Sequence, residues 1–259
     1  MVNTTLFDVS DRVALLTGAS KGMGRAMAEG LAEHGARVMI SSRKVDQCAA
    51  AAAEINAHIG EERVYFHACN AGYKDQLKAL VDATHDRLGP VDILVGNAGT
   101  NPFYGPMSQL PDEAYDKVMT TNVKANHWLA QMVAPDMVAK GRGSIMITAS
   151  TGAFGPSTTT GVYNISKLAV IGLVRNIAAE FGRHGVRANA ICPGLIMTDF
   201  AEALWNSPEA HDRESQSTAL KRLGVADDFK GVAVFLASDA SAYMTGQAVT
   251  VCGGQRMWT

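Results

Sequence analysis

Positive charge is not in excess in this sequence, and that absence argues against nucleic-acid binding. The chain carries 23 Lys and Arg against 25 Asp and Glu, a formal net charge of −2. A protein that binds nucleic acid needs a basic surface to neutralise phosphates, and no basic run provides one here. We expect no nucleic-acid partner.

Paired cysteines, metal motifs and membrane segments are also missing. The four cysteines, Cys48, Cys69, Cys192 and Cys252, show no Cys-x-x-Cys spacing. Reduced thiols are therefore expected rather than disulfides or metal ligands. The seven histidines form no His-Glu-x-x-His pair, so we expect no metal site. No apolar run reaches the about 20 residues that span a membrane.

Targeting signals are not evident at either end. Residues 1–8 lack the basic and then apolar regions of a secretory signal, and residues 256–259 carry no peroxisomal tripeptide. We therefore expect a cytoplasmic protein without membrane contact.

What the sequence does contain is a regular alternation of short apolar runs and longer helical stretches. The predicted strands are residues 13–17, 37–41, 64–67, 93–96, 144–148, 186–192 and 248–251. Helical stretches such as 23–34, 45–58 and 75–88 lie between them. This order predicts βαβ units in an α/β, Rossmann-type, doubly wound fold, with a seven-stranded parallel sheet flanked by helices.

One domain is expected over residues 1–259, since no linker, repeat or low-complexity tract interrupts the pattern. The polar stretch 206–218 is too short for a second domain. It predicts a mobile flap, at about residues 195–220, that covers a substrate.

A glycine-rich turn, Thr17-Gly18-Ala19-Ser20-Lys21-Gly22-Met23-Gly24, joins the first predicted strand to the first helix. Glycines there permit a tight turn and close approach to a pyrophosphate, which the helix N-terminus attracts. Such a sequence is often only a turn. Its place in the first βαβ unit favours a dinucleotide site.

The second predicted strand ends without the carboxylate that binds ribose hydroxyls in an NAD site, since no acid occurs before Asp46. Ser42 and Arg43 stand there instead, and Lys21 lies in the glycine-rich turn. Two cations near the 2′-position favour a 2′-phosphate, and so NADP(H) over NAD(H). The alternative is that Arg43 and Lys44 are solvated loop charges.

A candidate catalytic group is Ser150 followed by Tyr163-Asn164-Ile165-Ser166-Lys167. In a helix, the phenol and the ammonium four residues apart share one face. At about 4 Å and an effective dielectric of about 20 they would interact by roughly 4 kcal/mol, enough to lower a tyrosine pKa by about three units. That predicts a general acid and base near neutral pH. The alternative is a surface tyrosine and a solvated lysine.

Polar residues near other strand ends extend the candidate site. Asn70 is expected to face an adenine edge, and the turn Asn97-Ala98-Gly99 to let a nucleotide pass. Asn122 lies in a long predicted helix that starts near Asp112. Because Asn is a poor helix former, its side chain is expected to have a partner or a function. Pro135 is expected to bend or end this helix.

Large apolar side chains are predicted to line a substrate pocket, and each of them could instead pack in the core. The loop 102–106 follows a strand at the edge of the sheet where ligands bind. An apolar pocket favours aromatic or aliphatic ketones and aldehydes over sugars. The predicted lining is Phe103, Tyr104, Phe154, Phe200, Leu204 and Trp205.

Together these motifs resemble the classical short-chain dehydrogenase/reductase family over essentially the whole chain. The resemblance implies that Tyr163 is the general acid and base, and that Lys167 lowers its pKa and binds the nicotinamide ribose. Ser150 would orient the substrate oxygen, and Asn122 would hold a water that links Lys167 to solvent. The implied cofactor contacts are Thr17, Gly18, Ser20, Lys21, Gly22, Met23, Gly24, Ser42, Arg43, Asn70, Asn97, Ala98, Gly99, Tyr163, Lys167, Pro193, Gly194, Ile196 and Thr198.

Within the family the chain resembles NADPH-dependent carbonyl/retinal reductases of the peroxisomal dehydrogenase/reductase type, in segments 41–44, 101–103, 122–125, 193–196 and 204–205. This implies a small-molecule carbonyl or alcohol substrate and a homotetramer or homodimer. The alternatives are an NAD-linked alcohol or diol dehydrogenase, a 3-oxoacyl thioester reductase and, more remotely, a non-catalytic nucleotide-binding protein.

Three positions depart from the family pattern. Gly96 stands where Asn usually precedes Asn-Ala-Gly, and is expected to loosen a strand contact. Gly152 comes one residue early, which would change the pocket floor. Cys252 replaces the usual Asp, and puts a subunit contact made by that carboxylate in doubt.

Overall fold

Seven parallel strands form the centre of the protein, in the order β3-β2-β1-β4-β5-β6-β7. The computed structural model describes residues 4–257, so Met1–Asn3 and Trp258–Thr259, on which the expectations about both ends partly depend, lie outside it. The strands are β1 (Val13–Thr17), β2 (Arg37–Ser41), β3 (Val64–Phe66), β4 (Ile93–Gly96), β5 (Gly143–Thr148), β6 (Val186–Pro193) and β7 (Ala248–Val251). The predicted seven-stranded parallel sheet is confirmed.

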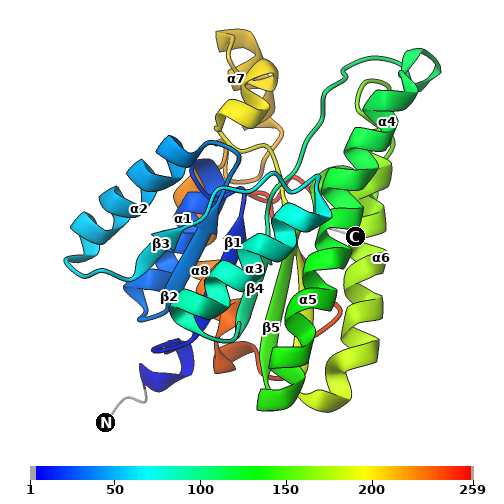
Figure 1. Ribbon diagram of the computed structural model, residues 1–259. Coiled ribbons are helices and arrows are strands. Elements are labelled where there is room, and N and C mark those ends of the chain that lie inside the picture. The colour runs from blue at the N-terminus through cyan, green and yellow to red at the C-terminus, as the bar shows by residue number, and fades with distance from the viewer. Residues whose placement is uncertain (1–3, 258–259) are drawn as a thin grey trace.

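Helices cover both faces of the sheet (Figure 1). They are α1 (Gly22–Glu33), α2 (Val45–Ile59), α3 (Lys74–Leu88), α4 (Asp112–Met119), α5 (Ala125–Lys140), α6 (Gly161–Phe181), α7 (Pro208–Gln216) and α8 (Lys230–Ala237). Shorter helical turns are η1 (Thr4–Phe7), η2 (Met107–Gln109), η3 (Thr120–Lys124), η4 (Thr151–Phe154), η5 (Gly182–His184), η6 (Asp199–Leu204), η7 (Ala226–Phe229) and η8 (Asp239–Ser241).

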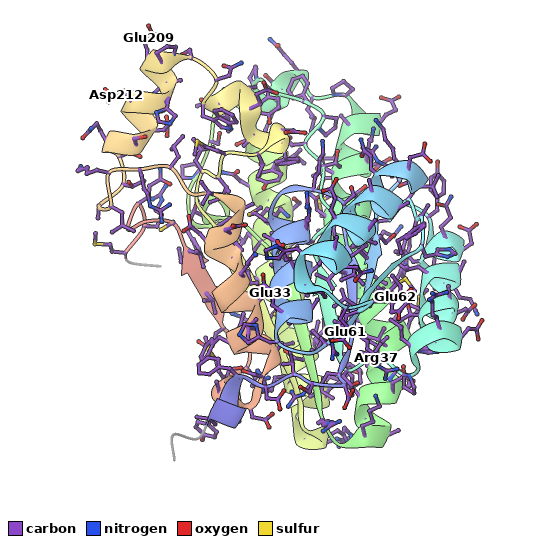
Figure 2. The ribbon with its side chains drawn as sticks, turned by 90° about the vertical axis from the view of Figure 1, so that its left-hand side faces the viewer. Glu33, Arg37, Glu61, Glu62, Glu209 and Asp212 are labelled. Atoms are coloured by element: carbon purple, nitrogen blue, oxygen red, sulfur yellow. The ribbon has the colours of Figure 1, made fainter. Side chains whose placement is uncertain are left out.

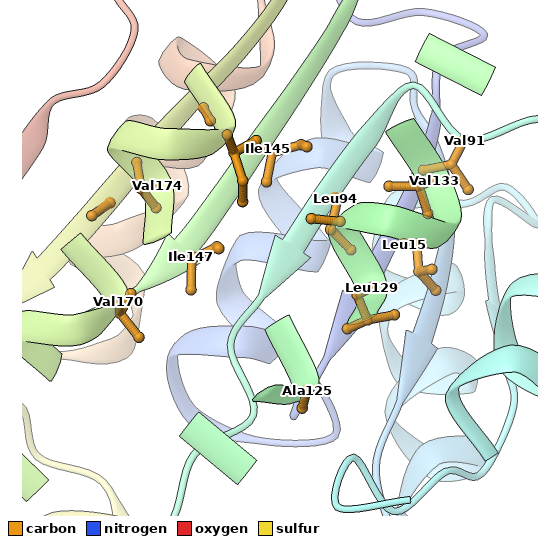
Figure 3. Packing of buried hydrophobic residues seen from close by; sticks show 14 of the residues in the cluster. Leu15, Val91, Leu94, Ala125, Leu129, Val133, Ile145, Ile147, Val170 and Val174 are labelled. Carbon is orange, nitrogen blue, oxygen red and sulfur yellow. The ribbon is translucent and has the colours of Figure 1, made fainter. Parts of the chain in front are cut away.

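Alternate residues of each strand supply the two cores. In β1, Leu15 packs in the core beneath α3, α5 and α6, whereas Ala14 and Leu16 pack in the core beneath α1, α2 and α8. This explains why the strands are continuously apolar. Figure 3 shows the first core, where Leu129 of α5 and Val170 of α6 lie over the strands. Full burial of such side chains contributes roughly 1.5–3 kcal/mol each.

The order of the strands reverses between β1 and β4. β1 pairs with β2 on one side and with β4 on the other, so the chain leaves the two strands in opposite directions. This divergence opens a crevice at the carboxyl edge of the sheet, where open α/β folds bind ligands. The predicted flap contains η6 and α7, and α7 stands beyond this edge (Figure 1).

The long helix predicted from Asp112 is interrupted, but not at Pro135. It consists of α4, the π-helical turn η3 and α5, and α5 continues past Pro135 to Lys140. Pro135 was expected to bend or end this helix, and the helix does not end there. Gln131, whose carbonyl would have accepted the missing N–H, lies on the exposed side of α5, where water can replace that bond.

The cysteines are free thiols, as expected. Cys48, Cys69 and Cys192 are buried, and Cys252 is partly exposed. Among the described residues, no helix combines the length and the apolar character needed to cross a membrane.

The space beside Gly96 is occupied by a side chain from helix α5. A Cβ at this position would overlap the Asn126 side chain, which is itself buried and donates to the Asn122 carbonyl at 2.7 Å. The expected loosening of a strand contact is therefore not found, because Asn126 occupies the space.

Replacing Gly96 with Ala is expected to destabilise the protein. Overpacking of this kind costs about 1–3 kcal/mol, which for a chain of this size lowers Tm by roughly 2–12 °C. Thermal unfolding followed by circular dichroism measures the change.

Gly231→Ala is the matched control, since a Cβ there meets nothing within 4 Å and Gly231 lies in α8. Its Tm should equal or exceed that of the wild type. An unchanged Tm in Gly96→Ala would show that Asn126 moves aside without cost.

Candidate active site

The glycine-rich turn is shaped by two residues in the left-handed region. Gly18 has φ +62° and Gly22 has φ +57°, values that residues other than glycine rarely adopt. Gly24 has a different role, because a Cβ there would overlap the Gly18 carbonyl. It lets α1 pack closely on the turn and does not line the cleft.

The first turn of α1 is open toward the cleft. Lys21 occupies the N-cap position and its side chain makes no capping hydrogen bond. The N–H groups of this turn therefore lack a side-chain acceptor, and Gly22 and Met23 line the cleft. With the positive end of the helix dipole they form a cradle that fits a pyrophosphate.

A cleft of about 1120 Å³ runs along the carboxyl edge of the sheet and gathers most of the predicted residues. Gly24 and Asn122 are the two predicted catalytic or cofactor residues that do not line it. Those that do are Thr17, Gly18, Ser20, Lys21, Gly22, Met23, Ser42, Arg43, Asn70, Asn97, Ala98, Gly99, Ser150, Tyr163, Lys167, Pro193, Gly194, Ile196 and Thr198.

The catalytic candidates lie together at this cleft. Tyr163 and Lys167 are one turn apart on α6, and the Lys167 Nζ lies 5.5 Å from the centroid of the Tyr163 ring. The Lys167 ammonium is buried and donates to the Thr148 carbonyl at 2.7 Å. Ser150 stands just beyond β5, and its Oγ accepts the Gly152 N–H at 3.0 Å. That bond leaves the Ser150 hydroxyl proton free for another acceptor.

The predicted lowering of the Tyr163 pKa is wrong. Burial raises the pKa of Tyr163 to about 12, and hydrogen bonding with Ser150 only partly opposes this. Burial likewise lowers the pKa of Lys167 to about 8, with the neighbouring Cys192 acting in the opposite direction. Spacing predicted the proximity of the two groups, but desolvation disfavours the charged form of each.

Asn122 lies behind the cleft, in the π-helical turn η3. Its amide oxygen accepts the Thr100 N–H at 2.8 Å, and its amide nitrogen donates to the Thr100 carbonyl and to Ser166 Oγ at 3.1 and 3.0 Å. Ser166 Oγ in turn donates to the Tyr163 carbonyl at 2.7 Å. Asn122 therefore joins the loop after β4 to the turn of α6 that carries Tyr163.

Sequence reasoning assigned no role to several residues that the structure brings to the site. Ser166 and Asn164 stand inside the Tyr163–Lys167 segment, and this position in the sequence could have indicated that they belong to the site. Tyr73, Lys117 and Thr121 also line the cleft. They are ordinary residues in and near helices, and no local pattern marks them.

Only three of the six residues predicted to line a substrate pocket line the cleft. Tyr104, Phe200 and Leu204 line the cleft, and the Phe200 ring lies 6.2 Å from that of Tyr163. The other three residues do not line it, which corrects that part of the prediction. Phe103 lies against Gly105, Phe154 packs on the core, and Trp205 has a buried, unpartnered Nε1.

The other two departures have local explanations. A Cβ at Gly152 would lie 2.7 Å from Asn164 Oδ1, so glycine lets Asn164 approach the segment after Ser150. Asn164 also donates to the Gly155 carbonyl at 3.0 Å. Cys252 Sγ accepts the Arg256 N–H at 3.3 Å and so holds the turn after β7.

Comparison with known proteins gives consistent matches over nearly the full chain. A family model described as enoyl-(acyl carrier protein) reductase matches residues 18–256. The rabbit (Oryctolagus cuniculus) dehydrogenase/reductase SDR family member 4 is 37% identical over 246 residues, covering 95% of this chain and 94% of its own length. The human (Homo sapiens) protein of the same name is 37% identical over 247 residues, covering 95% and 88%.

Two solved structures are also similar. A gluconate 5-dehydrogenase from Burkholderia cenocepacia J2315, in complex with NADP and tartrate, has a TM-score of 0.91 and 31% identity, covering 97% of both chains. A 7α-hydroxysteroid dehydrogenase, complexed with NADH and 7-oxo glycochenodeoxycholic acid, has a TM-score of 0.93 and 33% identity, covering 98% of both chains.

The buried ammonium of Lys167 is expected to titrate near pH 8, because burial disfavours its charged form. Nuclear magnetic resonance of labelled lysine side chains measures this titration directly. The signal should vanish in Lys167→Met. A midpoint above 10 for this signal would contradict the burial argument.

Proposed function

This chain belongs to the classical short-chain dehydrogenase/reductase family, and on that premise we propose that it reduces apolar ketones or aldehydes with NADPH. Enzymes of this family transfer hydride between a nicotinamide and an alcohol or carbonyl carbon. The observation that carries the proposal is the meeting of Ser150, Tyr163 and Lys167 at one cleft with the open helix N-terminus of the glycine-rich turn.

The cofactor preference is supported by the residues at the end of β2. Ser42 and Arg43 line the cleft there, as does Lys21 from the glycine-rich turn. The first carboxylate after β2 is Asp46, which does not line the cleft. This donor set fits a 2′-phosphate better than ribose hydroxyls. The similar gluconate 5-dehydrogenase was solved with NADP.

Tyr163 is the proton donor in the proposed mechanism. When bound, the nicotinamide supplies the hydride that reduces the carbonyl carbon. With a pKa of about 12, the Tyr163 phenol is protonated at neutral pH and can give its proton to the substrate oxygen. Ser150 donates its hydroxyl proton to the same oxygen when the substrate is bound and stabilises the charge that develops there.

Lys167 stabilises the phenolate that Tyr163 becomes after it gives up its proton. Its ammonium is fixed by the Thr148 carbonyl beside the phenol ring. With a pKa of about 8 it is charged at neutral pH, yet it releases a proton easily. It is therefore suited to return the proton to Tyr163. Asn122 supports this arrangement by bonding Thr100 and Ser166.

The substrate side of the cleft supports an apolar carbonyl compound. Tyr104, Phe200 and Leu204 are large, partly exposed side chains on the loop after β4 and on the flap. A 3-oxoacyl thioester is a second candidate substrate, because the description of the matching family model, enoyl-(acyl carrier protein) reductase, also names an acyl carrier. The similar hydroxysteroid dehydrogenase complexed with NADH favours an NAD-linked dehydrogenase as an alternative.

We also propose a homotetramer or homodimer formed from a single domain of residues 1–259. Exposed Ile165 and Leu168 lie on α6, 43% and 55% accessible, where a second copy could cover them.

We further propose a cytoplasmic location, which agrees with the free thiols.

Tyr163→Phe is expected to lower kcat for carbonyl reduction by at least about 100-fold, since the proton donor is lost. Initial rates with NADPH and NADH, using a diketone, an aryl aldehyde, retinal and a 3-oxoacyl thioester, identify the cofactor and the substrate. Tyr243→Phe is the control, because Tyr243 is fully exposed. Equal rates with NADH would contradict the proposed cofactor preference.

The rate of reduction is expected to fall as pH rises through about 8. Above that pH Lys167 loses the charge that stabilises the phenolate, whereas Tyr163 keeps its proton until about pH 12. A profile of kcat against pH from 6 to 10 tests this, and the falling limb should be absent in Lys167→Met. A flat wild-type profile would show that the charge of Lys167 does not assist the reaction.

A further inference from the structure

The flap is fastened to the glycine-rich turn by an ion pair. Lys21 Nζ lies 2.6 Å from Asp199 Oδ2, and the two residues are 178 positions apart in the sequence. Asp199 begins η6, the first turn of the flap. Both residues line the cleft, and their bond joins the flap to the glycine-rich turn.

The neighbouring residues of the two segments also meet. A Cβ on Gly22 would lie 3.2 Å from Thr198 Cγ2, which places Thr198 in contact with the glycine-rich turn. Residues 198–199 of the flap therefore lie against residues 21–22 of the turn. This packing brings the Asp199 backbone close to the turn that carries Lys21.

The ion pair conflicts with the role of Lys21 in cofactor binding. Lys21 is one of two cations that favour a 2′-phosphate, and Arg43, the other, forms no ion pair with any residue from 4 to 257. A phosphate that approaches Lys21 must compete with a carboxylate already bonded to it. If the carboxylate stays nearby, it also repels the phosphate.

We propose that Asp199 sets the affinity of this protein for the 2′-phosphate of NADP(H) by competing for Lys21. The inference rests on the proposed function, since it assumes that a 2′-phosphorylated nucleotide occupies the cleft. Binding of NADP(H) then breaks the Lys21–Asp199 pair, and the flap loses this attachment. NAD(H), which has no 2′-phosphate, leaves the pair intact.

Other acids of the flap do not offer the same competition. Glu209 and Asp212 do not line the cleft, and Figure 2 shows them on the outer side of α7. Glu214 lines the cleft but accepts from its neighbour Arg213 at 3.1 Å. An aspartate carboxyl is ionised at neutral pH, and Lys21 holds the pKa of Asp199 below its usual range.

The test compares the dissociation constants of NADPH and NADH in Asp199→Asn, measured by fluorescence titration at low ionic strength. Neutral Asn keeps the shape and removes the charge, so NADPH should bind about 3- to 10-fold more tightly. The affinity for NADH should change less than twofold. The gain for NADPH should shrink in 0.5 M salt, because both side chains are exposed.

Two further variants make the result specific. Glu202→Gln removes a carboxylate from the same turn η6, three residues away and outside the cleft, and should change neither affinity. In a Lys21→Ala background, Asp199→Asn should no longer favour NADPH by more than about twofold. An undiminished gain there would show that Asp199 acts independently of Lys21 and would overturn the proposal.

Other outcomes also decide the question. Equal tightening of NADPH and NADH would assign Asp199 a general effect on the flap, and unchanged or weaker NADPH binding would show that it does not compete. Either result overturns the inference while leaving the proposed function intact, provided that the wild type prefers NADPH. A wild type and an Asp199→Asn variant that both bind NADH as tightly as NADPH would overturn both.

Discussion

The side-chain amide of Asn97 connects the ends of three adjacent strands. Its Nδ2 donates to the Gly18 carbonyl after β1 at 2.8 Å, and its Oδ1 accepts the Thr148 hydroxyl at the end of β5 at 3.0 Å. The Thr148 carbonyl holds Lys167. One hydrogen-bonded chain therefore runs from the glycine-rich turn to the lysine of the catalytic group. Removing a member would leave partly buried polar groups unpaired.

This chain of bonds changes the meaning of a sequence motif. Asn97 was predicted as a cofactor contact, and it does line the cleft, but both ends of its amide are already bonded to protein. Its contribution is to fix the distance between the nucleotide cradle and the proton-transfer group. The positioning that catalysis requires is thus built into the edge of the sheet rather than into a flexible loop.

The sequence predicted the architecture well because apolar runs report burial directly. At Pro135 it left two outcomes open, a bend or an end, because the residue type gives the lost hydrogen bond but not whether water can replace it. At the site, spacing placed Tyr163 and Lys167 on one face of α6, yet the sign of the Tyr163 shift depended on desolvation, which spacing does not reveal. Phe154 and Phe200 show the same limit, since one packs on the core and the other lines the cleft.

The π-helical turn η3 accommodates one extra residue between α4 and α5. A π turn holds about one residue more than the equivalent α turn, so the extra residue does not change the direction in which α5 faces. If η3 became a regular α turn with the same number of residues, α5 would rotate by about 100° relative to α4. Leu129 and Val133 would then face away from the sheet they now cover. The π geometry of this turn is therefore what keeps the apolar face of α5 on the core.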